Sequence, residues 1–160
     1  MNKFCRFLSI VLVTVLIFTL SACGIARMPI TADDFTSKLQ DAGYTVIDET
    51  DKNAGGTTVL IAQSGDKQIE FYIFEDSNKT LETFNQIKER FIADKGPVVV
   101  NSQDVLINNY GFFTQTSAGK YNVVAFIDNT MVYAKVSDSN RSAVESIIDS
   151  LGYLQKSILR

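Results

Sequence analysis

The feature that most constrains the fold is a row of short apolar segments separated by very short turns in the second half of the chain. Loops of two to four residues join strands as antiparallel hairpins, because a parallel connection needs about a dozen residues or more. We therefore expect an antiparallel meander here. Its strands are predicted at 111–116, 121–127 and 130–136, and its turns at 117–120 and 128–129.

The rest of the chain predicts an α+β fold. The predicted strands carry apolar side chains on both faces of the sheet. This favours one antiparallel sheet with about three helices packed on it, as in an α/β/α sandwich. Further strands are predicted at 44–47, 57–62 and 68–74, with extended segments at 98–100 and 103–107. Helices are predicted from 31 to 42, from 76–78 to about 95, and from 137–140 to 152, with Ser142 and Glu145 as an alternative capping box for the last.

Local signals support the first two helices. Thr31 can cap the first helix, with Ile30 packing on Phe35, and Phe35 and Leu39 share one face. In the second helix, apolar residues recur with the helical period along one face, and a single lysine interrupts this apolar stripe. That stripe consists of Leu81, Phe84, Ile87, Lys88 and Phe91.

The N-terminal segment has the layout of an export signal. Lys3 and Arg6 precede the 14-residue run Phe7–Leu20, which is apolar apart from three hydroxyl residues. A bilayer core needs about 20 helical residues, so the run is short for a permanent membrane span and typical of a signal h-region. An uncleaved anchor, or an ordinary signal with an incidental cysteine, is the alternative interpretation.

The sequence Leu20-Ser21-Ala22-Cys23 matches a lipobox at every position, and here the chain resembles bacterial lipoprotein precursors. The resemblance implies diacylglycerol on Cys23 and cleavage before it, with the protein anchored on the extracytoplasmic face of the cell membrane. We thus expect a signal peptide (1–22), a lipidated Cys with a short tether (23–30), one α+β domain (31–153) and a C-terminal tail (154–160).

Two further resemblances concern the exported part. The segments Ile30–Phe35 and Gly43–Val46 are similar to the opening of short uncharacterised lipoproteins of Gram-positive bacteria. The order of elements in the second half, with Tyr110–Phe113 before the meander, resembles that of PsbP-like domains. Neither group implies a site or an activity.

The composition restricts the chemistry. Cys5 would leave with the signal and Cys23 would carry lipid, and the chain has no His and no Trp. This excludes His-dependent triads, cysteine nucleophiles and the Cys/His sites that Zn²⁺ prefers. After cleavage 13 basic and 18 acidic side chains remain, a net charge of −5, which gives no help in binding nucleic acid. We expect no catalytic residue, no metal and no cofactor.

Candidate motifs give no specific site. Glu49, Asp51 and Asn53 begin a calcium-loop pattern, but Ala54 replaces its glycine and Leu60 replaces its final glutamate. Gly55-Gly56 lacks the Gly-Lys-Ser/Thr of a phosphate loop. The adjacent carboxylate pairs lie at predicted helix starts, where capping explains them. These pairs are Asp33 with Asp34 and Glu75 with Asp76.

The aromatic strand residues are the remaining signal. We expect most to pack in the core and any exposed remainder to mark a partner or ligand surface. The set is Tyr72, Phe74, Phe112, Phe113, Phe126 and Tyr133. The leading hypothesis is a non-catalytic binding or accessory module that contacts the membrane through Cys23 and an envelope protein or small ligand. The alternatives are a carrier with an apolar pocket between sheet and helices, and a carboxylate-dependent hydrolase of the envelope.

Overall fold

The computed structural model describes residues 26–52, 57–96 and 99–154. Within these residues it has helices α2 (Ala32–Asp41), α3 (Ser77–Ala93) and α4 (Arg141–Ser150), and 3₁₀ turns at Thr50–Lys52 and Asp138–Asn140. The strands are β1 (Thr45–Asp48), β2 (Thr58–Ser64), β3 (Lys67–Ile73), β4 (Val99–Ile107), β5 (Tyr110–Ser117), β6 (Lys120–Ile127) and β7 (Thr130–Ser137).

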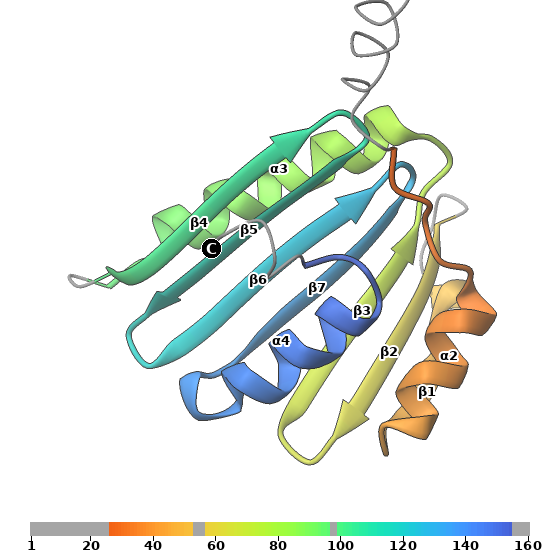
Figure 1. The fold of residues 1–160 in the computed structure, drawn as a ribbon, viewed down its shortest axis with the longest axis horizontal. Coiled ribbons are helices and arrows are strands. Elements are labelled where there is room, and N and C mark those ends of the chain that lie inside the picture. The colour runs from red at the N-terminus through yellow and green to blue at the C-terminus, as the bar shows by residue number, and fades with distance from the viewer. Residues whose placement is uncertain (1–25, 53–56, 97–98, 155–160) are drawn as a thin grey trace, which may run out of the picture.

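The strands form one seven-stranded sheet in the order β1-β2-β3-β7-β6-β5-β4, and every neighbouring pair is antiparallel. Strands β5 to β7 form the predicted meander, which β4 extends by pairing with β5, and Asp128 in the β6–β7 turn has a φ of +51°. Strand β7 then pairs with β3, which joins the meander to the first three strands (Figure 1). The two extended segments predicted before the meander are one strand, β4.

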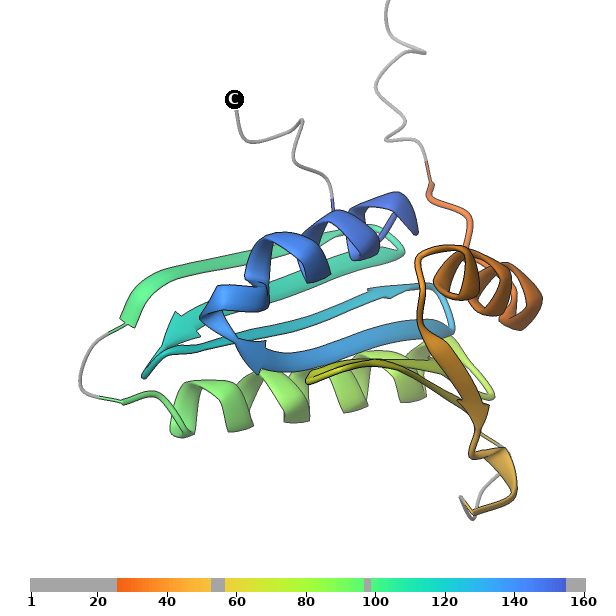
Figure 2. The ribbon, with the colours of Figure 1, turned by 90° about the horizontal axis from the view of Figure 1, so that it is seen from below.

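Helices cover both faces of the sheet, which confirms the α+β class and the three-layer sandwich. Helices α2 and α4 lie on one face and α3 lies on the other (Figure 2). Alternation along the strands explains this, since Ile69 and Phe71 pack toward α2 and α4, whereas Val124 and Phe126 on β6 pack toward α3.

The predicted starts of the first two helices are confirmed. The Thr31 hydroxyl accepts a hydrogen bond from the Asp34 N–H at 3.1 Å, and the Asp34 carboxylate accepts one from the Thr31 N–H at 3.2 Å. Asp76 caps α3 by accepting a bond from the Lys79 N–H at 2.9 Å. These contacts satisfy amides that the first turn of a helix leaves without a partner.

Helix α4 begins differently from the prediction. No side chain caps it, and a 3₁₀ turn over Asp138–Asn140 leads into its first residue, Arg141. Ser142 is not the N-cap of a capping box either, because the helix begins at Arg141 and Ser142 lies within its first turn. Glu145 pairs with Arg141, one turn earlier in the same helix, at 2.7 Å.

The predicted stripe of α3 is wrong in one position. Leu81 is 36% exposed, and Thr80 is fully buried in its place, with its hydroxyl donating to the Asp76 carbonyl at 3.0 Å. The position of Lys88 within the apolar stripe is explained by its partners. Its ammonium pairs with Asp104 on β4 and lies 5.8 Å from the centre of the Phe113 ring.

Residues of the predicted tether and tail pack on the domain. The Asn109 amide donates to the Arg27 carbonyl at 2.7 Å, and the Arg27 guanidinium donates to the Gly152 carbonyl at 2.7 Å. Tyr153 is fully buried and Leu154 is 7% exposed, both within the cluster under α2 and α4. Along the described residues, no helix is long and apolar enough to span a membrane.

Candidate functional site

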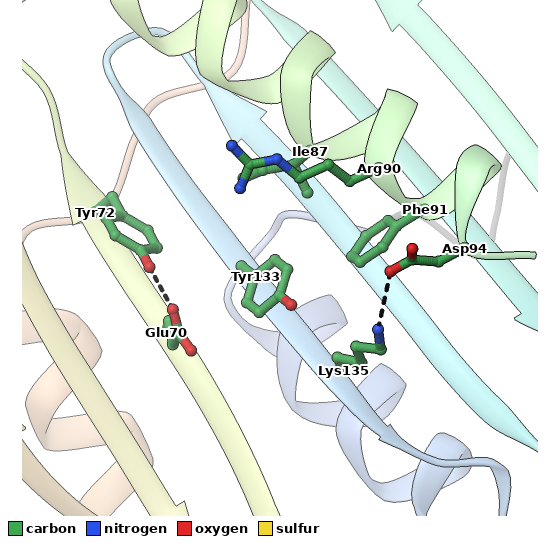
Figure 3. A pocket seen from close by; sticks show the side chains of 8 residues that line it. All are labelled: Glu70, Tyr72, Ile87, Arg90, Phe91, Asp94, Tyr133 and Lys135. Atoms are coloured by element: carbon green, nitrogen blue, oxygen red, sulfur yellow. Dashed lines mark hydrogen bonds and ion pairs between the residues drawn. The ribbon is translucent and has the colours of Figure 1, made fainter.

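A cleft of about 310 Å³ lies between α3 and the sheet, and we call it the α3 cleft. It exists because α3 crosses the sheet over β5 to β7 and leaves the adjoining part of β3 open. Side chains from α3 and from the strands β3 and β7 converge on the cleft (Figure 3). Its lining consists of Glu70 and Tyr72 from β3, Ile87, Arg90, Phe91 and Asp94 from α3 and its C-cap, and Tyr133 and Lys135 from β7.

Strand alternation places these residues. Glu70 and Tyr72 lie two apart and point to the same face of the sheet, opposite to Phe71. In the β3–β7 register Glu70 is directly across from Tyr133, so the acid and this phenol are neighbours on the floor of the cleft.

Two tyrosines form the aromatic part of the floor. The Tyr133 ring stacks on Phe91 with 5.6 Å between centroids, and the Tyr72 ring stacks on Phe74 at 5.9 Å. Of the six strand aromatics that the sequence singles out, Tyr72 and Tyr133 alone are only half-buried, and the other four are buried. The predicted exposed remainder is therefore this pair, and it lines the cleft.

The β3 side of the cleft is a hydrogen-bonded acid. The Tyr72 hydroxyl donates to one carboxylate oxygen of Glu70, and the Gln68 amide donates to the other at 2.7 Å. Burial, followed by the bond to Glu70, raises the pKa of Tyr72 well above its ordinary value. Burial and the Glu70 charge raise the pKa of Tyr133 as well. Both phenols therefore stay protonated at neutral pH. The Tyr72 proton is used in the bond to Glu70, whereas the Tyr133 hydroxyl can donate a hydrogen bond to a ligand.

The opposite side of the cleft carries positive charge. Lys135 pairs with Asp94 at 3.5 Å, an exposed contact. Arg90 extends from α3 toward the β3 side of the cleft (Figure 3), and its guanidinium forms no hydrogen bond or ion pair with another residue among those described. An exposed guanidinium with free donors can bind a carboxylate or phosphate in bidentate fashion.

The α3 cleft continues into a second hollow of about 300 Å³. The two hollows share Tyr72, Ile87 and Arg90, so together they form one groove between α3 and the sheet. The second hollow is more apolar, since Val59, Phe74 and Met131 contribute to its floor. The groove thus combines an apolar half with a polar, charged half.

The sequence-derived candidates lie elsewhere. Cys23, the predicted lipid attachment residue, is outside the described residues, as are the residues after Lys52 in the acidic loop. Glu49 pairs with Lys52 at 2.6 Å. Asp34 completes the capping box of α2, and its bonds to Thr31 lower its pKa. In the parts of the chain that the structure describes, no three His, Cys, Asp or Glu side chains gather as a metal site would require.

No family model, no curated protein and no solved structure matches the chain. The resemblances drawn from the sequence remain predictions. The geometry of the α3 cleft and the sequence of the N-terminal segment are therefore the basis of the functional proposal.

Proposed function

We propose that the protein is a lipid-anchored lipoprotein of the extracytoplasmic membrane face that acts as a non-catalytic binding module, with the α3 cleft as its binding site. The single observation that carries the binding role is the Arg90 guanidinium, without an ion-pair partner among the described residues, beside the half-buried rings of Tyr72 and Tyr133. Partly accessible rings beside a guanidinium with free donors can stack on a ligand and pair with its anionic group, which supports a binding role.

The N-terminal sequence supports the anchor. Two basic residues, a 14-residue apolar run and Leu20-Ser21-Ala22-Cys23 follow one another in the order of a lipoprotein signal. Lipid chains on Cys23 would hold the protein at the membrane, since each buried methylene contributes about 0.8 kcal/mol and two or more chains anchor stably.

The cleft chemistry suits a particular class of ligand. An anionic group would pair with Arg90, and a ring or an apolar portion would lie on Tyr72 and Tyr133. The Tyr133 hydroxyl remains a donor, whereas that of Tyr72 is bonded to Glu70. Both carboxylates of the cleft already have partners, Glu70 with Tyr72 and Asp94 with Lys135. Such an arrangement favours binding over hydrolysis, which needs an acid and a base free to exchange protons with a substrate.

The volume of the cleft favours a second candidate, a carrier of small apolar ligands. About 310 Å³ is at the lower end of the range of ligand pockets, roughly 300–1,000 Å³. The two candidates differ in their dependence on charge, since an apolar ligand would bind equally well without the Arg90 guanidinium.

The anchor is tested in cells that express the full chain. Wild type and Cys23→Ala are fractionated with and without an inhibitor of lipoprotein signal peptidase. We expect wild type in the membrane fraction and accumulation of its precursor only with the inhibitor, whereas the processing of Cys23→Ala should not respond to the inhibitor. Identical processing and location of the two proteins would refute the lipoprotein assignment.

The binding site is tested with a probe that combines a ring and an anion. Phenyl phosphate is titrated into the protein while the ring signals of Tyr72 and Tyr133 are followed by NMR, with phenol as the uncharged comparison. We expect saturable shifts with phenyl phosphate that weaken about tenfold in Arg90→Gln. This factor corresponds to about 1.4 kcal/mol, the lower part of the range for a charged hydrogen bond.

Lys79→Gln is the matched control, because Lys79 lies on the same helix and pairs with Glu82 outside the cleft. It should leave the titration unchanged. Equal binding of phenol and phenyl phosphate, unaffected by Arg90→Gln, would favour the apolar carrier instead. Absence of saturable shifts with either probe would count against the cleft as a binding site.

A further inference from the structure

The point at which the described chain enters the domain is held firmly at one end of the sheet. The Arg27 N–H donates to the Asn109 side chain at 3.2 Å, and the Asn109 amide donates back to the Arg27 carbonyl. The Arg27 guanidinium lies 3.6 Å from the centre of the Tyr110 ring and donates to the Gly152 carbonyl. Arg27 is therefore fixed beside the β4–β5 turn and the end of α4. The start of the described chain lies at the same end of the sheet as this turn (Figure 1).

The most exposed large apolar side chains lie around this point. Among the described residues these are Met28 at 87% exposed, Leu106 at 61% and Ile107 at 48%. Met28 follows Arg27 directly, and Leu106 and Ile107 end β4 just before the turn that contains Asn109. Because consecutive strand residues point to opposite faces, Leu106 and Ile107 flank both sides of the turn.

Chain length brings this end of the sheet to the proposed anchor. Cys23 and Arg27 are four residues apart, and four extended residues span at most about 14 Å. An acyl group on Cys23 lies in the bilayer, so Arg27 and the β4–β5 turn would be held within about that distance of the membrane surface. Val99, at the other end of β4, lies eight residues or roughly 26 Å farther along the strand.

We propose that Met28, Leu106 and Ile107 form a membrane-contact edge, which lies in the lipid interface and fixes the orientation of the domain on the bilayer. This inference rests on the proposed lipid anchor. The partner is a lipid bilayer rather than a protein, because the short reach from Cys23 keeps these exposed side chains close to the membrane surface.

The contact is apolar in character. Arg27 is occupied by Asn109, Tyr110 and Gly152, and the nearest turn carries Asp128, whose N–H donates to the Asn109 carbonyl at 2.8 Å. Asp149 lines the hollow beside Arg27. Anionic head groups should therefore not strengthen the contact, in contrast to polybasic membrane-binding surfaces.

The absence of Trp from the chain provides a clean optical test. Lipidated full-length Ile107→Trp and Leu106→Trp are purified and reconstituted into vesicles of phosphatidylcholine brominated on its acyl chains. Val99→Trp is the matched control, since Val99 lies on the same strand at 39% exposure. We expect fluorescence quenched at least twofold relative to unbrominated vesicles at positions 106 and 107, and little quenching at position 99.

Mass spectrometry of the same samples establishes whether diacylglycerol is attached to Cys23. Lipidated protein with no quenching at 106 and 107, or with equal quenching at 99, would overturn the membrane-contact edge while leaving the anchor in place. Quenching that appears only when phosphatidylglycerol is added would also overturn it, because it would show electrostatic docking. Unlipidated Cys23 in cells would instead refute the anchor itself.

Discussion

The two faces of the sheet are covered to different extents. Under α2 and α4, side chains from five strands pack into one large cluster with residues such as Phe35, Phe71 and Tyr153 fully buried. Under α3 a smaller, mostly aromatic cluster covers β5 to β7, and Tyr72 and Tyr133 remain at its margin. One face is thus a closed core, whereas the other leaves a groove in which side chains can meet a ligand.

The largest expected effect compares neighbours on β3 that point to opposite faces. Phe71 is fully buried and stacks on Phe35 at 4.8 Å, so Phe71→Ala should lower the free energy of unfolding by about 3–5 kcal/mol. Tyr72→Ala removes a half-buried ring and should cost only about 1–2 kcal/mol. Urea unfolding followed by circular dichroism measures both. Equal losses would mean that the groove side is as tightly packed as the core.

A smaller effect compares two hydroxyls. Tyr153 forms a buried hydrogen bond with the Thr130 hydroxyl, so Tyr153→Phe should lower the free energy of unfolding by about 0.5–1.5 kcal/mol. The Tyr133 hydroxyl has no hydrogen bond with another described residue, and Tyr133→Phe should be near neutral. If the order were reversed, the segment after α4 would not belong to the core.

The closed face should also respond to alkaline pH. Burial raises the pKa of Tyr110 to about 12, although the Arg27 charge opposes the shift. Because the folded pKa lies above the unfolded value of 10, the neutral phenol contributes stability that is fully present below pH 10 and is lost as the pH rises toward 12. Stability should fall across this range, and less so in Tyr110→Phe. Ultraviolet absorbance of the phenolate checks the pKa directly.

The smallest expected effect lies at the rim of the cleft. The Lys135–Asp94 pair is exposed, so Lys135→Gln should change the free energy of unfolding by less than about 1 kcal/mol. The same variant tests whether Lys135 assists Arg90, since it would then weaken phenyl phosphate binding without altering stability. A loss of stability comparable to that of Tyr72→Ala would show that the rim is part of the core.

Local patterns predict much of this fold and little of the cleft. The meander and the Thr31 capping box follow from residues close together in the sequence. The start of α4 does not, because a 3₁₀ turn over Asp138–Asn140 leads into the helix and no side chain caps it. Thr80 is buried where the sequence predicts Leu81 to be buried. This difference reflects the rotation of α3 about its axis on the sheet, which tertiary packing determines.

The cleft itself depends on where α3 lies. The sequence marks Tyr72 and Tyr133 as aromatic strand residues, but only the position of α3 decides that Phe113 and Phe126 are covered and these two are not. The sequence around Arg90 does not mark it as a binding residue, since Arg90 is one of several polar residues of an amphipathic helix. Its importance follows from β3 and β7, whose side chains lie across the cleft from it.

The fixed position of Arg27 has a mechanical consequence for a protein held by its N-terminus. A pull on that end would reach the bonds from Arg27 to Asn109 and Gly152 before it reached α2. The force would then be shared between the β4–β5 hairpin and the end of α4, which are more than 30 residues apart in the sequence. Such shear loading across several bonds resists extension better than peeling one helix from the surface, and single-molecule pulling of Arg27→Ala against wild type would measure the difference.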